Sequence, residues 1–233
     1  FPYQLHELSA LELKDFLKDQ SWRGLNVTIP YKKNACALAD SVSEDAQAIG
    51  AANTLVKEAN GLIAADNTDV YGFEYLVKSL KVNLNQKKAI VLGAFGGAGQ
   101  AVCYALKKGG AHVVGVSRNP QVSSSFVDYA ITYDQLKLHY DADLLVNTTP
   151  VGMSPHAGIS LLTKEELASF TSLQCVIDLI YNPLRSQLLL DAERLGILNA
   201  NGLKMLVAQA AKASSLFLSQ ETLDSQIECI SRD

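Results

Sequence analysis

The sequence has no strong excess of charge of either sign. It contains 20 Lys and Arg against 24 Asp and Glu, a formal net charge of −4, so it lacks the electrostatic footprint of a protein that binds nucleic acid or an anionic membrane. No apolar run approaches the roughly 18 residues that a membrane-spanning helix requires. The opening stretch, FPYQLHEL, lacks the basic and apolar regions of a signal peptide. We therefore expect a cytoplasmic protein with neither a nucleic acid nor a membrane as its partner.

Metal and disulfide chemistry also has little support. The four cysteines are isolated from one another and lie in or beside apolar stretches, as buried free thiols of a reducing compartment do. The four histidines show neither i,i+4 pairing nor a metal-ligand spacing against Cys or Asp. We expect no metal site at these positions. They are Cys36, Cys103, Cys175, Cys229, His6, His112, His139 and His156.

The first third of the chain reads as a mixture of helices and short strands. The 233 residues are 48% hydrophobic and 19% charged, which excludes a disordered protein and suits one large domain or two small ones. Asn60-Gly61 between two apolar runs is a strong hairpin signal. The expected elements are a helix over 6–20 capped by Ser9, a buried strand from Gly24 to Ile29, helical sequence over 31–50, strands at 53–57 and 62–65, and a helix over 70–80.

Beyond a polar linker at 83–88 the pattern changes. The strands become continuous apolar runs with no polar face, which a parallel sheet covered by helices on both sides requires. The sequence therefore predicts an α/β protein in which a doubly wound, Rossmann-like domain follows a smaller α/β domain. The expected elements are strands at 89–93, 112–117, 143–147 and 175–179, and helices at 97–108, at 202–219 and toward the C-terminus. We expect one domain from 1–82, completed by helices at about 203–233, and a second from 83–202.

A glycine-rich turn, VLGAFGGAGQAV, joins the first of these strands to its helix. Glycine lets the backbone approach a pyrophosphate, and the helix N-terminus offers free N–H donors. The match to GxGxxG is not strict, because Phe95 stands where the second glycine belongs. A nucleotide site is favoured over a purely structural turn. Its glycines are Gly93, Gly96, Gly97 and Gly99.

The tip of the next strand indicates which dinucleotide would bind. An NAD enzyme places an acidic side chain there for the ribose 2′-OH, but this sequence has Ser117, Arg118 and Asn119 and no acid before Asp128. An arginine suits a 2′-phosphate. The sequence thus favours NADP, against the alternative of a solvated surface arginine.

Polar side chains also gather where the strands of the first domain end. Asn26, Thr28 and Lys32 lie in NVTIPYK, Asn53 opens a second strand in AANTL, and Asp69 closes ADNTD after the hairpin. Buried polar groups need partners, so such clustering indicates a lined cleft. Each has a simpler interpretation as a cap or turn, and Asp69 in particular suits a helix N-terminus.

Seven motifs together resemble the shikimate dehydrogenase family. They are NVTIPYK, GAANTL, DNTDVYG, the glycine turn, VNTTPVGM, DLIYNP and NGLKMLVAQA, in the order of that family and over almost the whole chain. The resemblance implies NADP-dependent interconversion of 3-dehydroshikimate and shikimate, by two domains that close on a cleft. It also implies a role in aromatic amino acid biosynthesis. A chain that lacks the first unit of the family would be either truncated or part of a longer enzyme, so fusion to or association with another enzyme of that pathway is one expectation.

The resemblance also implies roles for individual residues. Lys32 and Asp69 match the catalytic Lys–Asp pair. Positions that match groups holding the substrate are Asn26, Thr28, Asn53, Tyr181 and Gln209. Positions that match groups holding the cofactor are Gly93, Ala94, Gly96, Gly97, Ala98, Ser117, Arg118, Asn119, Thr148, Leu179 and Gly202.

The sequence departs from the family pattern in several places. No Ser-x-Ser turn for the substrate carboxylate is found, as if the chain began one βα unit late. Phe95 looks like an extra residue in the glycine turn, Ser186 replaces a usual Thr, and Lys204 stands where Gly is common. Two alternatives stay open: a sensor of a shikimate-pathway metabolite without catalysis, and a relative that oxidises quinate. A sensor has no chemical need for Lys32 and Asp69.

Overall fold

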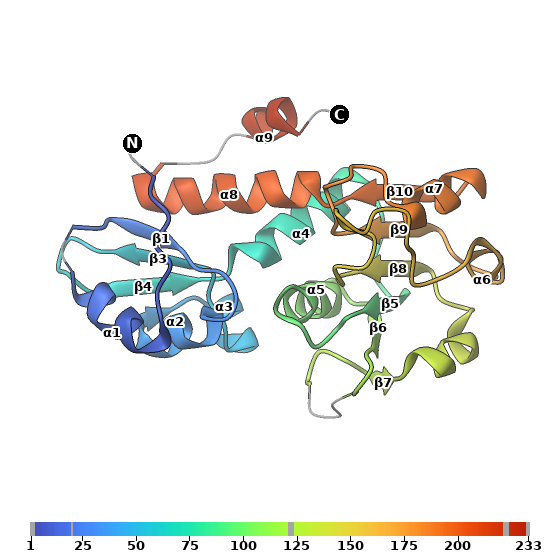
Figure 1. The fold of residues 1–233 in the computed structure, drawn as a ribbon, viewed down its shortest axis with the longest axis horizontal. Coiled ribbons are helices and arrows are strands. Elements are labelled where there is room, and N and C mark those ends of the chain that lie inside the picture. The colour runs from blue at the N-terminus through green and yellow to red at the C-terminus, as the bar shows by residue number, and fades with distance from the viewer. Residues whose placement is uncertain (1–2, 20, 121–123, 221–223, 232–233) are drawn as a thin grey trace. The chain divides into compact units, whose positions relative to one another are not determined.

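A computed structural model gives the fold of this chain (Figure 1). It describes residues 3–19, 21–120, 124–220 and 224–231. The chain forms two compact units, and both are discontinuous in sequence because the chain returns to each near its C-terminus. Unit 1 comprises Phe1–Thr68 and Ala213–Glu221, and unit 2 comprises Asp69–Lys212 and Thr222–Asp233. The division at 82 and 203 expected from the sequence is a division by function, and it stays a prediction.

Unit 1 contains a mixed four-stranded sheet with the strand order β1-β3-β4-β2. The predicted hairpin is confirmed: β3 and β4 pair antiparallel, with Leu55 opposite Ala65, and Gly61 in the connection takes the positive φ of 86° that favours glycine. The first strand is shorter and more exposed than expected, because it lies at an edge and pairs only with β3 among the described strands. The strands are β1 (Gly24–Asn26), β2 (Ser41–Val42), β3 (Thr54–Lys57) and β4 (Ile63–Asp66).

The helices of unit 1 are short, and side chains cap two of them. In α1 (Ala10–Lys18) the expected cap Ser9 forms a capping box with Glu12. The helical sequence expected over 31–50 is confirmed in part. It is divided into α2 (Lys32–Leu38) and α3 (Glu44–Ile49, capped by Ser43) by β2. The division occurs because Asp40 bonds Ile63 through both its backbone N–H and its carboxylate, which aligns β2 beside β4.

Unit 2 is built on a six-stranded sheet in which every pair is parallel, in the order β10-β9-β8-β5-β6-β7. All four residues of β8 and all four of β9 are buried, which explains their continuous apolar sequence. The predicted doubly wound domain is confirmed. Its strands are β5 (Lys88–Leu92), β6 (His112–Val116), β7 (Tyr129–Ile131), β8 (Leu144–Asn147), β9 (Cys175–Asp178) and β10 (Leu198–Asn201).

The sequence analysis did not predict the two edge strands, β7 and β10. Both are short and partly exposed: β7 has only three residues, YAI, and β10 alternates apolar residues with Asn, as LNAN. Only their neighbours in the sheet therefore reveal them. The helices of unit 2 occur where the sequence placed them or in the connections between strands. They are α4 (Thr68–Ser79), α5 (Gly97–Lys108), the 3-10 helix η1 (Tyr133–His139), α6 (Lys164–Ala168), α7 (Gln187–Arg194), α8 (Leu203–Leu218) and α9 (Asp224–Ile230), with α4 and α8 also contributing residues to unit 1.

The described residues contain neither a membrane-spanning helix nor a cluster of metal ligands. None of the helices described is long and apolar enough to cross a membrane. Among those same residues, no group of three or more His, Cys, Asp or Glu side chains could hold a metal ion.

Candidate functional site

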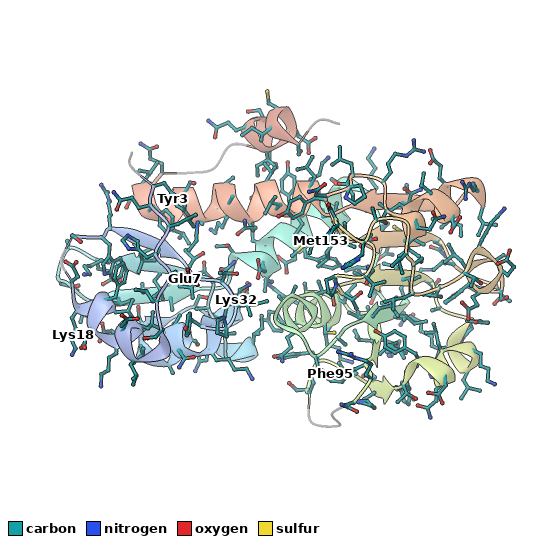
Figure 2. The ribbon with its side chains drawn as sticks, viewed as in Figure 1. Tyr3, Glu7, Lys18, Lys32, Phe95 and Met153 are labelled. Carbon is teal, nitrogen blue, oxygen red and sulfur yellow. The ribbon has the colours of Figure 1, made fainter. Side chains whose placement is uncertain are left out.

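Lys32 is the first residue of α2 in unit 1 (Figure 2). The preceding Tyr31 makes no side-chain cap, and the first turn of this helix contains no acidic residue. A helix N-terminus carries partial positive charge, so an ammonium group there does not stabilise the helix. The position of Lys32 therefore has no helix-stabilising explanation, which favours a functional one.

Three backbone hydrogen bonds join the segments that carry the candidates of unit 1. The N–H of Ala52 donates to the carbonyl of Lys32 at 2.8 Å, and the N–H of Val27 donates to the carbonyl of Asn53 at 2.7 Å. The N–H of Asn53 donates to the carbonyl of Asp66 at 3.1 Å. The sequence predicted that polar strand ends gather, and these bonds show how three segments distant in sequence meet around Asn53.

The side chain of Asn53 is only 5% exposed and is held in one orientation. Its Oδ1 accepts from the backbone N–H of Thr68 at 2.8 Å, from the Thr68 hydroxyl at 3.2 Å and from the Thr54 hydroxyl at 3.0 Å. A backbone N–H can only donate, so the atom facing Thr68 is the amide oxygen and the NH₂ faces the other way. Thr54 and Thr68 orient this amide, a role that the sequence alone did not reveal.

Three further candidates, Asn26, Thr28 and Asp69, are more accessible to solvent than Asn53. Asn26 and Thr28 are exposed, and the Asn26 amide donates to the Tyr3 hydroxyl at 2.8 Å. Asp69 lies in the first turn of α4, directly after Thr68. A carboxylate is stabilised at a helix N-terminus, so Asp69 has a structural explanation as well as a functional one.

In unit 2 the predicted cofactor positions share one structural property. Because the strands of a parallel sheet end at the same edge, residues that directly follow them lie along one crevice, where ligands of open α/β sheets bind. Five candidates are the first residues after β5, β6, β8, β9 and β10. These are Gly93, Ser117, Thr148, Leu179 and Gly202, respectively.

The glycine turn after β5 lies at the point where the strand order reverses, between β8 and β6. Gly93 has a φ of 80°, and a Cβ on Gly99 would lie 2.3 Å from the Gly93 carbonyl oxygen. Gly96 caps α5 without a side-chain bond, and a Cβ on Gly97 would meet nothing within 4 Å. Free N–H groups beside open space suit a pyrophosphate.

Phe95 is accommodated inside this turn without disrupting it (Figure 2). Its side chain is half-buried, and its carbonyl accepts a hydrogen bond from the Gln100 side chain at 3.2 Å. The helix still begins at Gly97. The residue that departs from the GxGxxG pattern therefore leaves the start of α5 in place.

Other candidates in the crevice are close-packed. The Thr148 hydroxyl donates to the Leu92 carbonyl at 2.7 Å. A Cβ on Gly202 would lie 2.0 Å from the Leu179 carbonyl oxygen, so only glycine fits there. By contrast, Arg118 is exposed at the tip of β6, where a guanidinium can reach a ligand. Thr148, Leu179 and Gly202 are thus fixed by packing, whereas Arg118 is open to solvent.

A buried carboxylate, Asp178, joins two loops of this crevice. Its Oδ2 accepts from the Ser186 hydroxyl at 2.5 Å, and its Oδ1 accepts from the Asn147 amide at 3.0 Å and from the Ile180 N–H at 3.1 Å. Burial raises the pKa of Asp178, and these hydrogen bonds oppose that rise. The amide oxygen of Asn147 in turn accepts from the Thr149 hydroxyl at 2.7 Å. The sequence analysis did not single out this network.

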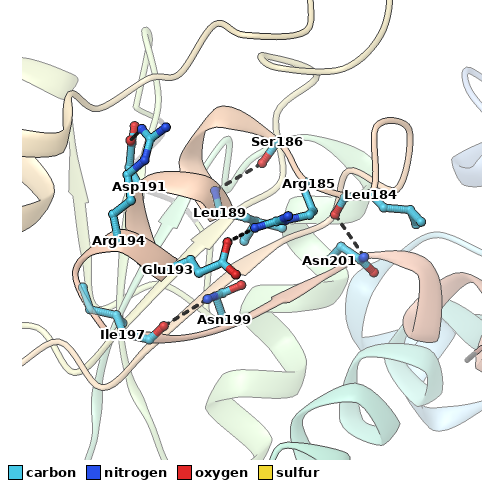
Figure 3. A network of polar contacts seen from close by, with 10 residues as sticks. All are labelled: Leu184, Arg185, Ser186, Leu189, Asp191, Glu193, Arg194, Ile197, Asn199 and Asn201. Atoms are coloured by element: carbon cyan, nitrogen blue, oxygen red, sulfur yellow. Dashed lines mark hydrogen bonds and ion pairs between the residues drawn. The ribbon is translucent and has the colours of Figure 1, made fainter. Parts of the chain in front are cut away.

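The same network fastens the loop that carries Tyr181, whose side chain is 46% exposed. Ser186 also caps α7 by accepting from the Leu189 N–H, and Asn201 donates to the Leu184 carbonyl at 3.1 Å (Figure 3). The Ser186 hydroxyl therefore both caps α7 and bonds the buried carboxylate of Asp178. The loop is held from β9, β10 and α7 together.

Comparisons with known proteins agree with this arrangement. Residues 2–55 match the model of the shikimate dehydrogenase substrate binding domain. The NADP(+) shikimate dehydrogenase of Caldanaerobacter subterraneus subsp. tengcongensis is 39% identical over 212 residues, covering 86% of this chain and 74% of that protein. The chain belongs to the shikimate dehydrogenase family.

Solved structures of the family show the same fold. A chorismate mutase/shikimate 5-dehydrogenase fusion protein from Clostridium acetobutylicum matches with a TM-score of 0.88 and 35% identity, over 97% of this chain and 83% of that one. Shikimate 5-dehydrogenase from Thermus thermophilus, in complex with NADP(H) and shikimate, matches with a TM-score of 0.82 and 34% identity. The match covers 97% of this chain and 85% of the Thermus chain.

Proposed function

We propose that this chain is an NADP-dependent shikimate dehydrogenase, which reversibly reduces 3-dehydroshikimate to shikimate. The proposal rests on the position of Lys32 in this chain, which belongs to the shikimate dehydrogenase family. Lys32 stands at a helix N-terminus that it does not stabilise, and its carbonyl is bonded to the residue before Asn53. This bond places the segment that carries Lys32, the proposed proton donor, beside the segment that carries the oriented amide of Asn53.

The residues of unit 2 fit a dinucleotide. Gly96 gives the N-terminus of α5 no side-chain cap, and the space beside Gly97 is open, which suits the pyrophosphate. Ser117, Arg118 and Asn119 would hold the ribose 2′-phosphate, and an exposed arginine matches that charge. When bound, NADPH supplies the hydride for the reduction.

The chain itself supplies the proton and holds the substrate. A ring ketone that gains a hydride leaves an oxygen that must gain a proton. Lys32 donates that proton from its ammonium group, and it stabilises negative charge on the oxygen. Asp69, the other member of the proposed pair, accepts a hydrogen bond from a neighbouring hydroxyl of the substrate.

Polar side chains bind the remaining hydroxyl groups. The NH₂ of Asn53 is the donor that faces away from Thr68, and amides suit a polyol because they both donate and accept. Gln209, Thr28 and Asn26 hold further oxygens, and Tyr181 makes an additional contact. A polyol site that loses one such partner leaves a polar group unpaired, at a cost of roughly 1–3 kcal/mol.

The test is the absorbance of reduced cofactor when purified protein is mixed with shikimate and NADP. Parallel reactions replace NADP with NAD and shikimate with quinate. We expect the fastest reduction with shikimate and NADP. Faster reduction with quinate would assign the chain to quinate oxidation instead. Shikimate binding without reduction of either cofactor would favour a metabolite sensor.

Two finer points belong to the proposal. Association with another enzyme of the same pathway is supported by the likeness to the chorismate mutase fusion, and co-purification with a chorismate mutase would test it. A cytoplasmic location stays a prediction, which fractionation of the source cells would test.

A further inference from the structure

Two helices of unit 2 carry a predicted site residue each, and they touch at a glycine. Asp69 lies in the first turn of α4, and Gln209 lies in the middle of α8. Between them, Gly72 of α4 packs directly on α8. A Cβ on Gly72 would lie 2.6 Å from the Met205 carbonyl oxygen and 3.0 Å from the Gln209 Cβ.

This contact leaves no room for a larger residue. Glycine in a helix interior destabilises the helix relative to alanine, yet Gly72 is buried within α4. The nearest atom to its missing Cβ belongs to the backbone of α8, and a backbone atom cannot rotate away as the end of a side chain can. Any side chain at position 72 would therefore move one helix with respect to the other.

The register of the contact connects it to the site. Asp69 lies three residues before Gly72 in α4, and Gln209 lies four residues after Met205 in α8. Residues three or four apart share one face of a helix. The faces that meet at Gly72 are thus the faces that carry Asp69 and Gln209.

A charged residue of α9, Glu228, contacts both α4 and α8 close to Gly72. Glu228 accepts a hydrogen bond from the Tyr75 hydroxyl of α4 at 3.1 Å. It also pairs with the Lys204 ammonium of α8 at 3.2 Å. A tyrosine hydroxyl keeps its proton and stays a donor at neutral pH, and burial together with the bond to Glu228 raises the pKa of Tyr75 further, to about 12.

We propose that Gly72 and Glu228 are positioning residues, which together fix Gln209 with respect to Asp69 and so shape the substrate-binding site. Gly72 sets how closely α8 approaches α4, and Glu228 holds the two helices in that register through Tyr75 and Lys204. The inference rests on the proposed function, because it takes Asp69 and Gln209 as substrate contacts.

The first test is Gly72→Ala. We expect kcat/KM for shikimate to fall about 10- to 100-fold, since small displacements of a substrate-positioning group cost that much. We expect the Kd for NADP, measured by calorimetry, to stay within about twofold. The glycine turn does not share this contact, and Gly202, just before α8, is held by its own close contact with Leu179. Ser79→Ala, on an exposed position of the same helix, serves as the control. A kcat/KM within about twofold of wild type, or equal losses for shikimate and NADP, would overturn the inference.

The second test is Glu228→Gln, which keeps the side-chain shape but removes the charge that Lys204 pairs with. We expect a several-fold rise in the KM for shikimate with little change in the Kd for NADP. Asp141→Asn, which removes an ion pair with Lys88 at the opposite end of the parallel strands, is the matched control. This variant decides the matter if Gly72→Ala does not fold, and an unchanged KM contradicts the role of Glu228.

Failure of the proposed function is recognised separately. A wild-type protein that neither binds nor oxidises shikimate contradicts that function before any variant is made. Hydrogen exchange of the α8 amides at 203–212 then tests the contact between α4 and α8 independently of activity. Faster exchange in both variants than in their controls supports it, and unchanged exchange overturns it.

Discussion

The two units hold their candidate residues by different means. In unit 2 the cofactor candidates follow parallel strands, of which β8 and β9 are buried along their whole length. In unit 1 the strands have two to four residues and are partly exposed, and the candidates are joined by bonds between loops and helix ends. The parallel sheet thus provides a common edge for a cofactor. The small mixed sheet provides irregular junctions where polar side chains for a substrate meet.

The largest expected effect tests whether unit 1 carries the chemistry. We expect Lys32→Ala to lower kcat by about 10²- to 10⁴-fold, because it removes the proton donor. Shikimate affinity should change only a few-fold, as measured by calorimetry. Lys33→Ala, at an exposed position of the same helix, should leave kcat unchanged. A Lys32→Ala enzyme that keeps its rate would exclude this residue from the mechanism.

The next comparison separates packing from ligand binding within the glycine turn of unit 2. Gly99→Ala places a Cβ 2.3 Å from the Gly93 carbonyl oxygen, so we expect a loss of about 1–3 kcal/mol in the free energy of unfolding and weak NADP binding. Gly97→Ala meets no protein atom within 4 Å, so stability should persist while NADP binds less tightly. Urea unfolding and calorimetry measure the two quantities. Equal stability of both variants would contradict the packing argument.

A smaller effect concerns the choice of cofactor. We expect Arg118→Ala to weaken NADP binding about 10-fold or more while leaving NAD binding nearly unchanged, because a charge-assisted hydrogen bond to the 2′-phosphate contributes about 1.5–3 kcal/mol. Arg185→Ala, which removes an exposed arginine that pairs with Glu193, provides the control. Equal losses for NADP and NAD would rule out the 2′-phosphate assignment.

The smallest expected effect concerns the buried carboxylate that joins the crevice loops. Burial raises the pKa of Asp178 in the folded protein above its unfolded value of 3.8, so the folded state binds more protons through this group. Its contribution to stability is therefore full below about pH 4 and is lost as pH rises through the folded pKa. We expect the free energy of unfolding of wild type, relative to Asp178→Asn, to fall from acidic to neutral pH. A relative stability that rises with pH in urea titrations would refute this.

The accuracy of the sequence analysis differs between the units for a physical reason. The helix over 97–108 and the strands at the centre of the parallel sheet were predicted within one residue, because burial on both faces demands uninterrupted apolar sequence. The stretch 31–50 was predicted as helical, and the interruption by β2 was missed, because the backbone and carboxylate of Asp40 bond a residue 23 positions away. Local propensity carries no signal of such a partner.

The sequence by itself determined the two α/β patterns, the hairpin, the glycine turn and the polar strand ends, because hydrophobic periodicity and turn chemistry are local properties. The tertiary structure alone decided which polar groups meet. The Thr68 N–H fixes the orientation of the Asn53 amide. Asp178 joins Asn147 to Ser186, and α8 packs on Gly72. These contacts link residues far apart in the chain, and only the folded backbone brings them within hydrogen-bonding or van der Waals distance.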